Sequence, residues 1–170
     1  MSCATVADAK VFVYCSEASP SGFDPTIATS GTTYDAVGHT IYNRLVEFKK
    51  GTTEVVPALA ESYDISDDGL QYTFHLRPGV KFQTTDYFTP TREFNADDVM
   101  FSFERQWKKD HPWHQYAENV SWGYFEDLGL NELIESIDKV DDMTVRFKLN
   151  RKEAPFLADI AIPFASIVSK

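Results

Sequence analysis

Two histidines, His111 and His114, stand three residues apart and are side chains that could share a metal ion. Pro112 lies between them and predicts a turn rather than a helix face, and no third ligand is placed at a suitable spacing. We therefore expect solvated loop histidines here and no metal site.

Acidic residues form two further patterns that could do chemistry. Residues 64–69 resemble the opening of a calcium-binding loop, but the twelfth position is His75 instead of a bidentate glutamate. Asp97–Asp98 and Asp141–Asp142 could supply a general acid and base, but adjacent side chains point apart on a helix, and helix-start and turn roles explain both pairs. Motifs for a nucleophilic serine or a nucleotide are absent from the sequence. The sequence predicts no enzyme and no cofactor.

A group of aromatic residues lies close together in the second half of the chain: Trp113, Tyr116, Trp122, Tyr124 and Phe125. Large aromatic side chains fill protein cores, and the same side chains line ligand pockets. Both interpretations stay open, and the second would apply to a Trp or Tyr in the irregular segment 116–123.

The elements that position these residues follow from hydrophobic spacing. An apolar run predicts a buried strand over Val11–Cys15, in which Cys15 would be a buried thiol. Residues 16–31 are rich in Pro and Gly and predict a long irregular loop, and loops of that length tend to bind ligands. Apolar residues three and four apart predict a helix centred in Tyr34–Phe48.

The rest of the chain predicts hairpins and a central helix. Strands are expected at 63–65 and 71–76, joined by a turn containing Asp-Gly, with a short extended piece at 80–82. Asn95 is predicted to cap a helix whose apolar stripe repeats every four residues. A second hairpin is expected over 137–149, and Pro155 suits the first turn of a short last helix.

Composition limits the classes of partner. The 170 residues are 43% hydrophobic and 14% aromatic, which indicates a folded domain rather than a disordered chain. Sixteen Lys and Arg against 26 Asp and Glu give a net charge of −10, which argues against a nucleic acid or an anionic membrane surface as partner. The most apolar window, Ala158–Val168, is interrupted by Asp159 and Pro163, so no membrane span is predicted.

The two ends of the sequence also lead to predictions about the length and processing of the protein. The first residues lack a basic region followed by an apolar stretch, so we expect a mature N-terminus or a trimmed precursor. The chain stops shortly after an apolar run that reads as core, which suggests a portion of a longer protein.

Several segments together resemble the start of the mature family 5 extracellular solute-binding proteins of bacteria, in particular their dipeptide-binding branch and its haem- and glutathione-binding relatives. The resemblance runs from about Lys10 to Lys170. It is carried by residues 13–17, 22–25, 29–35, 42–47, 57–61, 72–77, 94–99, 140–142 and 154–158. Residues 113–122 depart from the dipeptide branch by what looks like one extra residue, which affects the expected side-chain preference for the ligand.

The resemblance implies a mixed α/β (α+β) fold, a periplasmic binding protein-like clamp of two lobes with an extra subdomain. Residues 1–9 would be a tail, 10–42 the first segment of lobe I with a loop on the ligand side, and 43–170 the extra subdomain, incomplete at its C-terminal end. The Asp and Arg that hold a dipeptide's charged ends in this family would lie downstream of this sequence.

The resemblance also implies a site and partners. Thr29 would contact the peptide main chain, with Ser30 and Gly31 beside it and Trp122 facing the ligand, while Cys15 would form a disulfide with a residue beyond Lys170. The protein would be a monomer that captures a dipeptide or short peptide in the periplasm for the membrane permease of an ATP-driven importer. It would be secreted through a cleaved signal peptide that this chain lacks, and a lipid-anchored form is open. Haem or glutathione as ligand, or a stand-alone interaction module, remain the alternatives.

Overall fold

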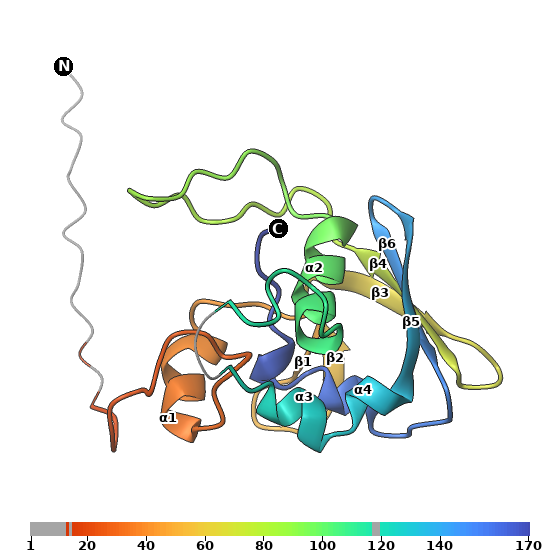
Figure 1. Ribbon diagram of the computed structural model, residues 1–170, viewed down its shortest axis with the longest axis horizontal. Helices are drawn as coiled ribbons and strands as arrows, with labels where there is room; N and C mark the ends of the chain where they lie inside the picture. The colour runs from red at the N-terminus through yellow and green to blue at the C-terminus, as the bar shows by residue number, and fades with distance from the viewer. Residues whose placement is uncertain (1–12, 14, 117–119) are drawn as a thin grey trace.

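The computed structural model describes residues 13, 15–116 and 120–170. Figure 1 shows a four-stranded sheet at one side, a central helix against it, and the N-terminal segment of residues 15–38 at the other side. Of the helices in these residues, none is long and apolar enough to cross a membrane. The helical elements are α1 (Gly31–Thr33), the π-helical turn η1 (Tyr34–Gly38), α2 (Ala96–Trp107), α3 (Gly123–Asp127), α4 (Leu130–Leu133), α5 (Phe156–Asp159) and the 3-10 turn η2 (Pro163–Ala165).

The sheet is antiparallel throughout, with the strand order β3-β4-β6-β5. Its strands are β3 (Ala60–Ile65), β4 (Gln71–Leu76), β5 (Ile134–Asp141) and β6 (Thr144–Leu149). Alternate residues of β4 and β6 are buried, so one face of the sheet forms the core. Both predicted hairpins are confirmed, and the first turns at Gly69, whose φ of 68° favours glycine.

The central helix α2 is buried on two sides. Its predicted apolar stripe is confirmed: Val99 and Phe103 are buried, and the Phe103 ring lies 4.9 Å from that of Phe147 on β6. Asn95 caps the helix as predicted, because its Oδ1 accepts a 2.9 Å hydrogen bond from the Asp97 N–H. The predicted short helix at Pro155 is also confirmed as α5, with Pro155 at its N-cap.

Asp98 joins three segments at the start of α2. Its fully buried carboxylate accepts hydrogen bonds of 2.6 and 2.8 Å from the Arg92 guanidinium, 3.0 Å from the Asn95 N–H and 2.9 Å from the Lys170 N–H. The sequence predicted only a favourable charge in the first turn. The structure adds a link between the helix, the segment before it and the last residues of the chain.

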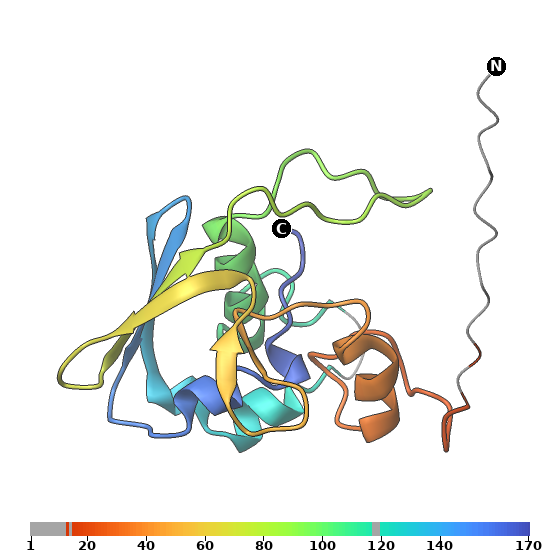
Figure 2. The ribbon, with the colours of Figure 1, turned by 180° about the vertical axis from the view of Figure 1, so that it is seen from behind.

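The helix predicted over Tyr34–Phe48 is wrong in its position. Helical turns cover residues 31–38, and residues 46–48 form strand β1 (Val46–Phe48), paired with β2 (Val55–Pro57). Figure 2 shows this small hairpin apart from the main sheet. Ile41 is 50% exposed, whereas Leu45 and Val46, which are neighbours in sequence, are both buried. This pattern of burial is not that of a helix with a single apolar stripe. Pairing with β2 satisfies the backbone of this segment instead.

The predicted buried strand over Val11–Cys15 is not observed where the structure describes it. Val13 is 78% exposed and Cys15 is an exposed free cysteine, so the buried-thiol interpretation is wrong as well. Residues 11, 12 and 14 lie outside the described part. Neither described residue has a neighbouring strand to pair with among the described residues, which explains the loss. The irregular loop over 16–31 is confirmed up to Ser30.

Residues 80–94 form an arm that extends from the domain (Figure 1). The Phe94 N–H donates to the Val80 carbonyl at 2.9 Å and closes the base of the arm. The extended piece predicted at 80–82 is not a strand. The N-terminal segment meets the domain where Gly38 packs on Pro163, and a Cβ at Gly38 would lie 2.7 Å from the proline Cβ.

We expect Asn95→Ala to lower the free energy of unfolding by about 0.5–2 kcal/mol, because α2 loses a cap at its first turn. Denaturant titration followed by far-UV circular dichroism measures the change. Asn131→Ala is the matched control, since that residue is exposed and its bond from the Trp107 indole N–H is accepted by the backbone carbonyl, which the substitution keeps. An unchanged midpoint for Asn95→Ala would show that the cap contributes nothing.

Candidate ligand-binding site

The site is built on a turn in the irregular N-terminal segment. The Asp24 Oδ1 accepts hydrogen bonds from the Thr26 N–H at 2.9 Å and from the Thr26 hydroxyl at 2.6 Å. Thr26 is buried, as are Pro25 and Ala28. An aspartate that bonds to the backbone two residues later stabilises a local turn, so this stretch has a defined conformation without regular secondary structure.

Arg105 of α2 lies under this turn. Its Nη2 is 3.5 Å from the Asp24 Oδ2 and donates to the Thr26 hydroxyl at 3.3 Å. The side chain is buried, and its guanidinium carbon lies within 6 Å of three ring centroids: 5.5 Å from Trp122, 5.8 Å from Tyr116 and 5.9 Å from Phe101. An aromatic cage and a carboxylate together compensate a buried cation.

Tyr116 completes the cluster. Its hydroxyl donates to the Asp24 Oδ2 at 2.8 Å. Burial, followed by this hydrogen bond and the Asp24 charge, raises the pKa of Tyr116, while Arg105 opposes the rise. The phenol therefore stays protonated well into the alkaline range and keeps donating to Asp24.

The predicted site residues Thr29, Ser30 and Gly31 follow this turn directly. Thr29 is exposed, and its hydroxyl and backbone groups make no hydrogen bond within the described residues. Ser30 caps α1, because its Oγ accepts from the Thr33 N–H at 3.4 Å. No atom of the described residues lies within 4 Å of where a Gly31 Cβ would be, so the backbone there faces open space.

Trp122 lies next to the same turn but inside the protein. A Cβ added at Gly123 would lie 3.1 Å from the Thr29 Cγ2, which brings the two predicted segments together. The Trp122 ring is 1% exposed and packs on His114, Tyr116 and Arg105. Its indole N–H is buried and has no hydrogen-bond partner among the described residues. Of the two interpretations of the aromatic group, this chain by itself shows the packed one for Trp122.

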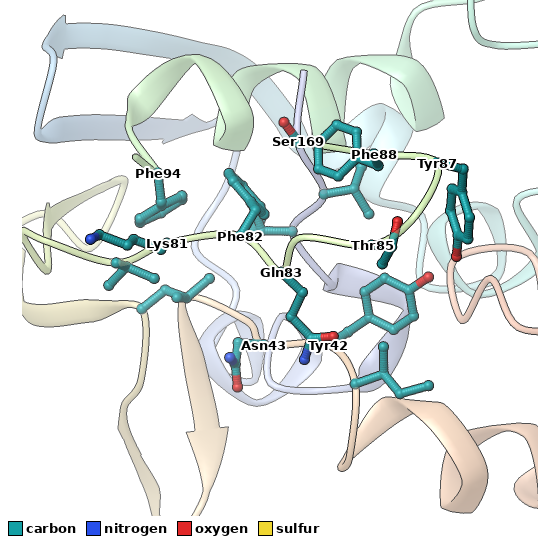
Figure 3. A pocket seen from close by; sticks show the side chains of 15 residues that line it. Tyr42, Asn43, Lys81, Phe82, Gln83, Thr85, Tyr87, Phe88, Phe94 and Ser169 are labelled. Atoms are coloured by element: carbon teal, nitrogen blue, oxygen red, sulfur yellow. The ribbon is translucent and has the colours of Figure 1, made fainter. Parts of the chain in front are cut away.

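A cavity of 420 Å³ lies beside this cluster, between the arm and residues 41–43 and 167–169 (Figure 3). Phe82, Phe88 and Phe94 contribute most of its aromatic lining, and Tyr87 and Tyr42 stand at one end. Burial raises the pKa of Tyr42, with a smaller contribution from Asp24. None of Thr29, Ser30, Gly31 and Trp122 lines this cavity. It is an aromatic recess, distinct from the predicted contact loop.

Sequence reasoning named Tyr116 and Trp122 but missed Asp24 and Arg105. A signal for Arg105 was present, because Asp98, Ser102 and Arg105 stand at positions i, i+4 and i+7 and share a face of α2. All three are buried, which makes a second, polar stripe beside the apolar one. Asp24 carried no comparable signal.

The two histidines considered as metal ligands lie in different environments. His111 is partly exposed, and burial lowers its pKa. His114 is buried with its Nδ1 2.8 Å from the Arg105 carbonyl oxygen. Across the described residues, no group of three or more His, Cys, Asp and Glu side chains is placed to hold a metal ion.

Comparison with known proteins identifies the family. Residues 54–170 match the model of the bacterial extracellular solute-binding proteins, family 5 (middle part). The chain belongs to this family. It is 59% identical over its full length to the dipeptide-binding protein of Escherichia coli K12, and 55% identical over 158 residues to heme-binding protein A of Haemophilus influenzae.

A solved structure shows the same fold. The dipeptide-binding protein of Pseudoalteromonas sp. SM9913, in complex with Met-Leu, superposes with a TM-score of 0.87 at 45% identity over 92% of this chain. The chain covers 31% of that protein and 32% of the Escherichia coli relative. The predicted mixed α/β architecture of a periplasmic binding protein is therefore confirmed for a part about a third as long as its relatives.

We expect the stability of the chain to fall as the pH rises above about 10, because unfolded tyrosine ionises there while the folded Tyr116 resists ionisation. Tyr116→Phe removes this contribution. Its free energy of unfolding should be about 1–3 kcal/mol lower at pH 8, where a hydrogen bond to a charged group is lost, and should fall less steeply between pH 9 and 11.

Urea titrations across this pH range measure both effects. The matched control is Tyr87→Phe, since Tyr87 is 91% exposed and should leave both the level and the slope unchanged. Equal slopes for the wild type and Tyr116→Phe would contradict the raised pKa of Tyr116 in the folded chain.

Proposed function

We propose that this chain is the N-terminal part of the substrate-binding component of an ATP-driven importer, and that it binds dipeptides or short peptides without chemical change. The observation that carries the proposal is the Thr29–Gly31 segment. Thr29 is exposed, its hydroxyl and backbone groups make no hydrogen bond within the described residues, and the segment directly follows the buried turn at Asp24–Thr26. Such groups pair with peptide N–H and C=O regardless of side chain.

The relatives support peptides as the ligand class. The Escherichia coli relative is named a dipeptide-binding protein, and the Pseudoalteromonas structure holds Met-Leu. Binding of haem is the second candidate, favoured by the name of the Haemophilus relative at 55% identity. The neutral contact segment fits a peptide main chain better than it fits a large flat ring with two carboxylates.

The finer parts of the proposal concern the whole protein. The ligand would be captured in the periplasm and passed to membrane permease subunits by a monomer secreted through a cleaved signal peptide. In this view residues 10–42 belong to lobe I and 43–170 to the extra subdomain. Cys15, an exposed free thiol in this chain, would pair with a downstream cysteine.

We expect the 170-residue chain alone to bind dipeptides poorly. Neutral hydrogen bonds contribute about 0.5–1.5 kcal/mol each, whereas immobilising a ligand costs about 4–15 kcal/mol. Titration calorimetry of this chain with Ala-Ala and Met-Leu should show no binding at micromolar concentrations. The full-length protein is the positive control, and micromolar affinity of the isolated chain would refute the expectation.

In the full-length protein, Thr29→Val removes the hydroxyl at nearly constant size. The affinity for dipeptides should fall by about 2- to 12-fold, equivalent to about 0.5–1.5 kcal/mol, and by a similar factor for peptides of different composition. Titration against Ala-Ala, Met-Leu and Gly-Glu measures the loss. Thr89→Val, an exposed threonine on the arm, is the control.

Three outcomes separate the possibilities for Thr29. A uniform loss supports a main-chain contact, and a loss confined to one peptide would place Thr29 in a side-chain pocket instead. No loss for any peptide would exclude the hydroxyl as a contact. Haem titrated in parallel tests the second candidate.

A further inference from the structure

We infer that Arg105 is a positioning residue that locks the Asp24–Thr26 turn onto α2 and so holds Thr29–Gly31 in the conformation that receives a ligand. The inference rests on the proposed function and extends it to a residue whose side chain bonds to the Asp24–Thr26 turn and not to Thr29, Ser30 or Gly31.

The first step is the connection itself. Arg105 reaches from α2 to a segment 79 residues earlier in the chain and contacts both polar side chains of the turn, Asp24 and Thr26. The other bond that holds Asp24 from outside the turn is the one from Tyr116. Both Arg105 and Tyr116 approach the same oxygen, Oδ2, so the two contacts act on one carboxylate.

The second step is that Arg105 has little freedom to lie elsewhere. Its side chain is 8% exposed, and its Nε is buried without a hydrogen-bond partner among the described residues. The guanidinium is confined by Phe101, Tyr116 and Trp122. A buried cation is tolerated only with an opposite charge, and Asp24 is the carboxylate that pairs with it.

The third step links the turn to the contact loop. Thr26 and Thr29 are three residues apart, and Ala28 between them is buried with its carbonyl oxygen accepting a 2.8 Å hydrogen bond from the Tyr34 hydroxyl. The Tyr34 hydroxyl thus holds Ala28, the residue before Thr29, while Arg105 and Tyr116 hold the preceding turn. Without Arg105 the turn is held from outside by the Tyr116 bond, so the exposed Thr29 keeps its position against Gly123 for a smaller fraction of the time.

A released loop binds less tightly even when the protein stays folded. If the receptive conformation is populated for only a fraction of the time, the apparent Kd rises by the inverse of that fraction. Arg105→Met keeps an unbranched apolar stem but removes the charge, the ion pair with Asp24 and the hydrogen bond to Thr26. We expect a rise in Kd for Ala-Ala of about tenfold or more in the full-length protein.

The experiment compares Arg105→Met, Arg105→Lys and Asp24→Asn in the full-length protein, under conditions where each variant is fully folded. Calorimetry with Ala-Ala gives the Kd, and hydrogen exchange gives the protection of amides 26–34 against those of β6. Lys139→Met is the matched control, because Lys139 forms an exposed ion pair with Asp97 at the other end of α2.

The inference predicts weaker binding and faster exchange at residues 26–34 in Arg105→Met, with β6 unchanged and partial recovery in Arg105→Lys. Combining Asp24→Asn with Arg105→Met should add less than the sum of the two single effects. Wild-type Kd and exchange rates in Arg105→Met, or a loss of protection shared by β6, would overturn it.

The proposed function is tested separately by the wild type. If the wild-type protein binds no dipeptide, the proposed function fails whatever the variants do, and the role in ligand reception fails with it. If the wild type binds and Arg105→Met binds equally well, only the role of Arg105 fails.

Discussion

The buried carboxylate of Asp98 is the constraint on which the arrangement around α2 depends. An ionised group without solvent is stable only when its oxygens are fully bonded, and Arg92, the Asn95 N–H and the Lys170 N–H supply those bonds at the positive end of the helix. The arm, the helix and the last residues of the chain are therefore fixed relative to one another. Because the helix is fixed at this end, the position of Arg105 about 10 Å along it is fixed too.

The two buried faces of α2 contact different parts of the molecule. The apolar face, with Val99 and Phe103, packs on the sheet and stabilises the domain. The polar face holds the outer segments: Asp98 and Ser102 bind residues near the C-terminus, and Arg105 binds the N-terminal turn. A single helix thus connects the predicted extra subdomain to the predicted first segment of lobe I. Under the proposed function, reception of a peptide by Thr29 would depend on a residue of the other part.

A feature of this structure could be predicted from sequence when neighbouring residues determine it. The Asp-Gly turn and the Asn95 cap act within a few residues, and both were predicted correctly. The helix over Tyr34–Phe48 was misplaced because Leu45 and Val46 are buried by distant segments that the spacing does not reveal. The pairing of Asp24 with Arg105 is the least predictable feature, since the residues next to each of them in sequence give no indication of the other. Thr29 and Trp122 were named through a family resemblance, not through such local signals.

The long separation between Thr26 and Arg105 also bears on the order in which the molecule folds. The hairpins β3–β4 and β5–β6 and the helix α2 form from neighbouring residues, whereas the N-terminal turn must close a loop of 79 residues to reach its partner. Closing long loops is entropically unfavourable and slows folding. The domain around α2 can therefore assemble first, as the template on which the N-terminal turn docks last. A nascent chain would acquire its core well before the Asp24–Thr26 turn reaches Arg105.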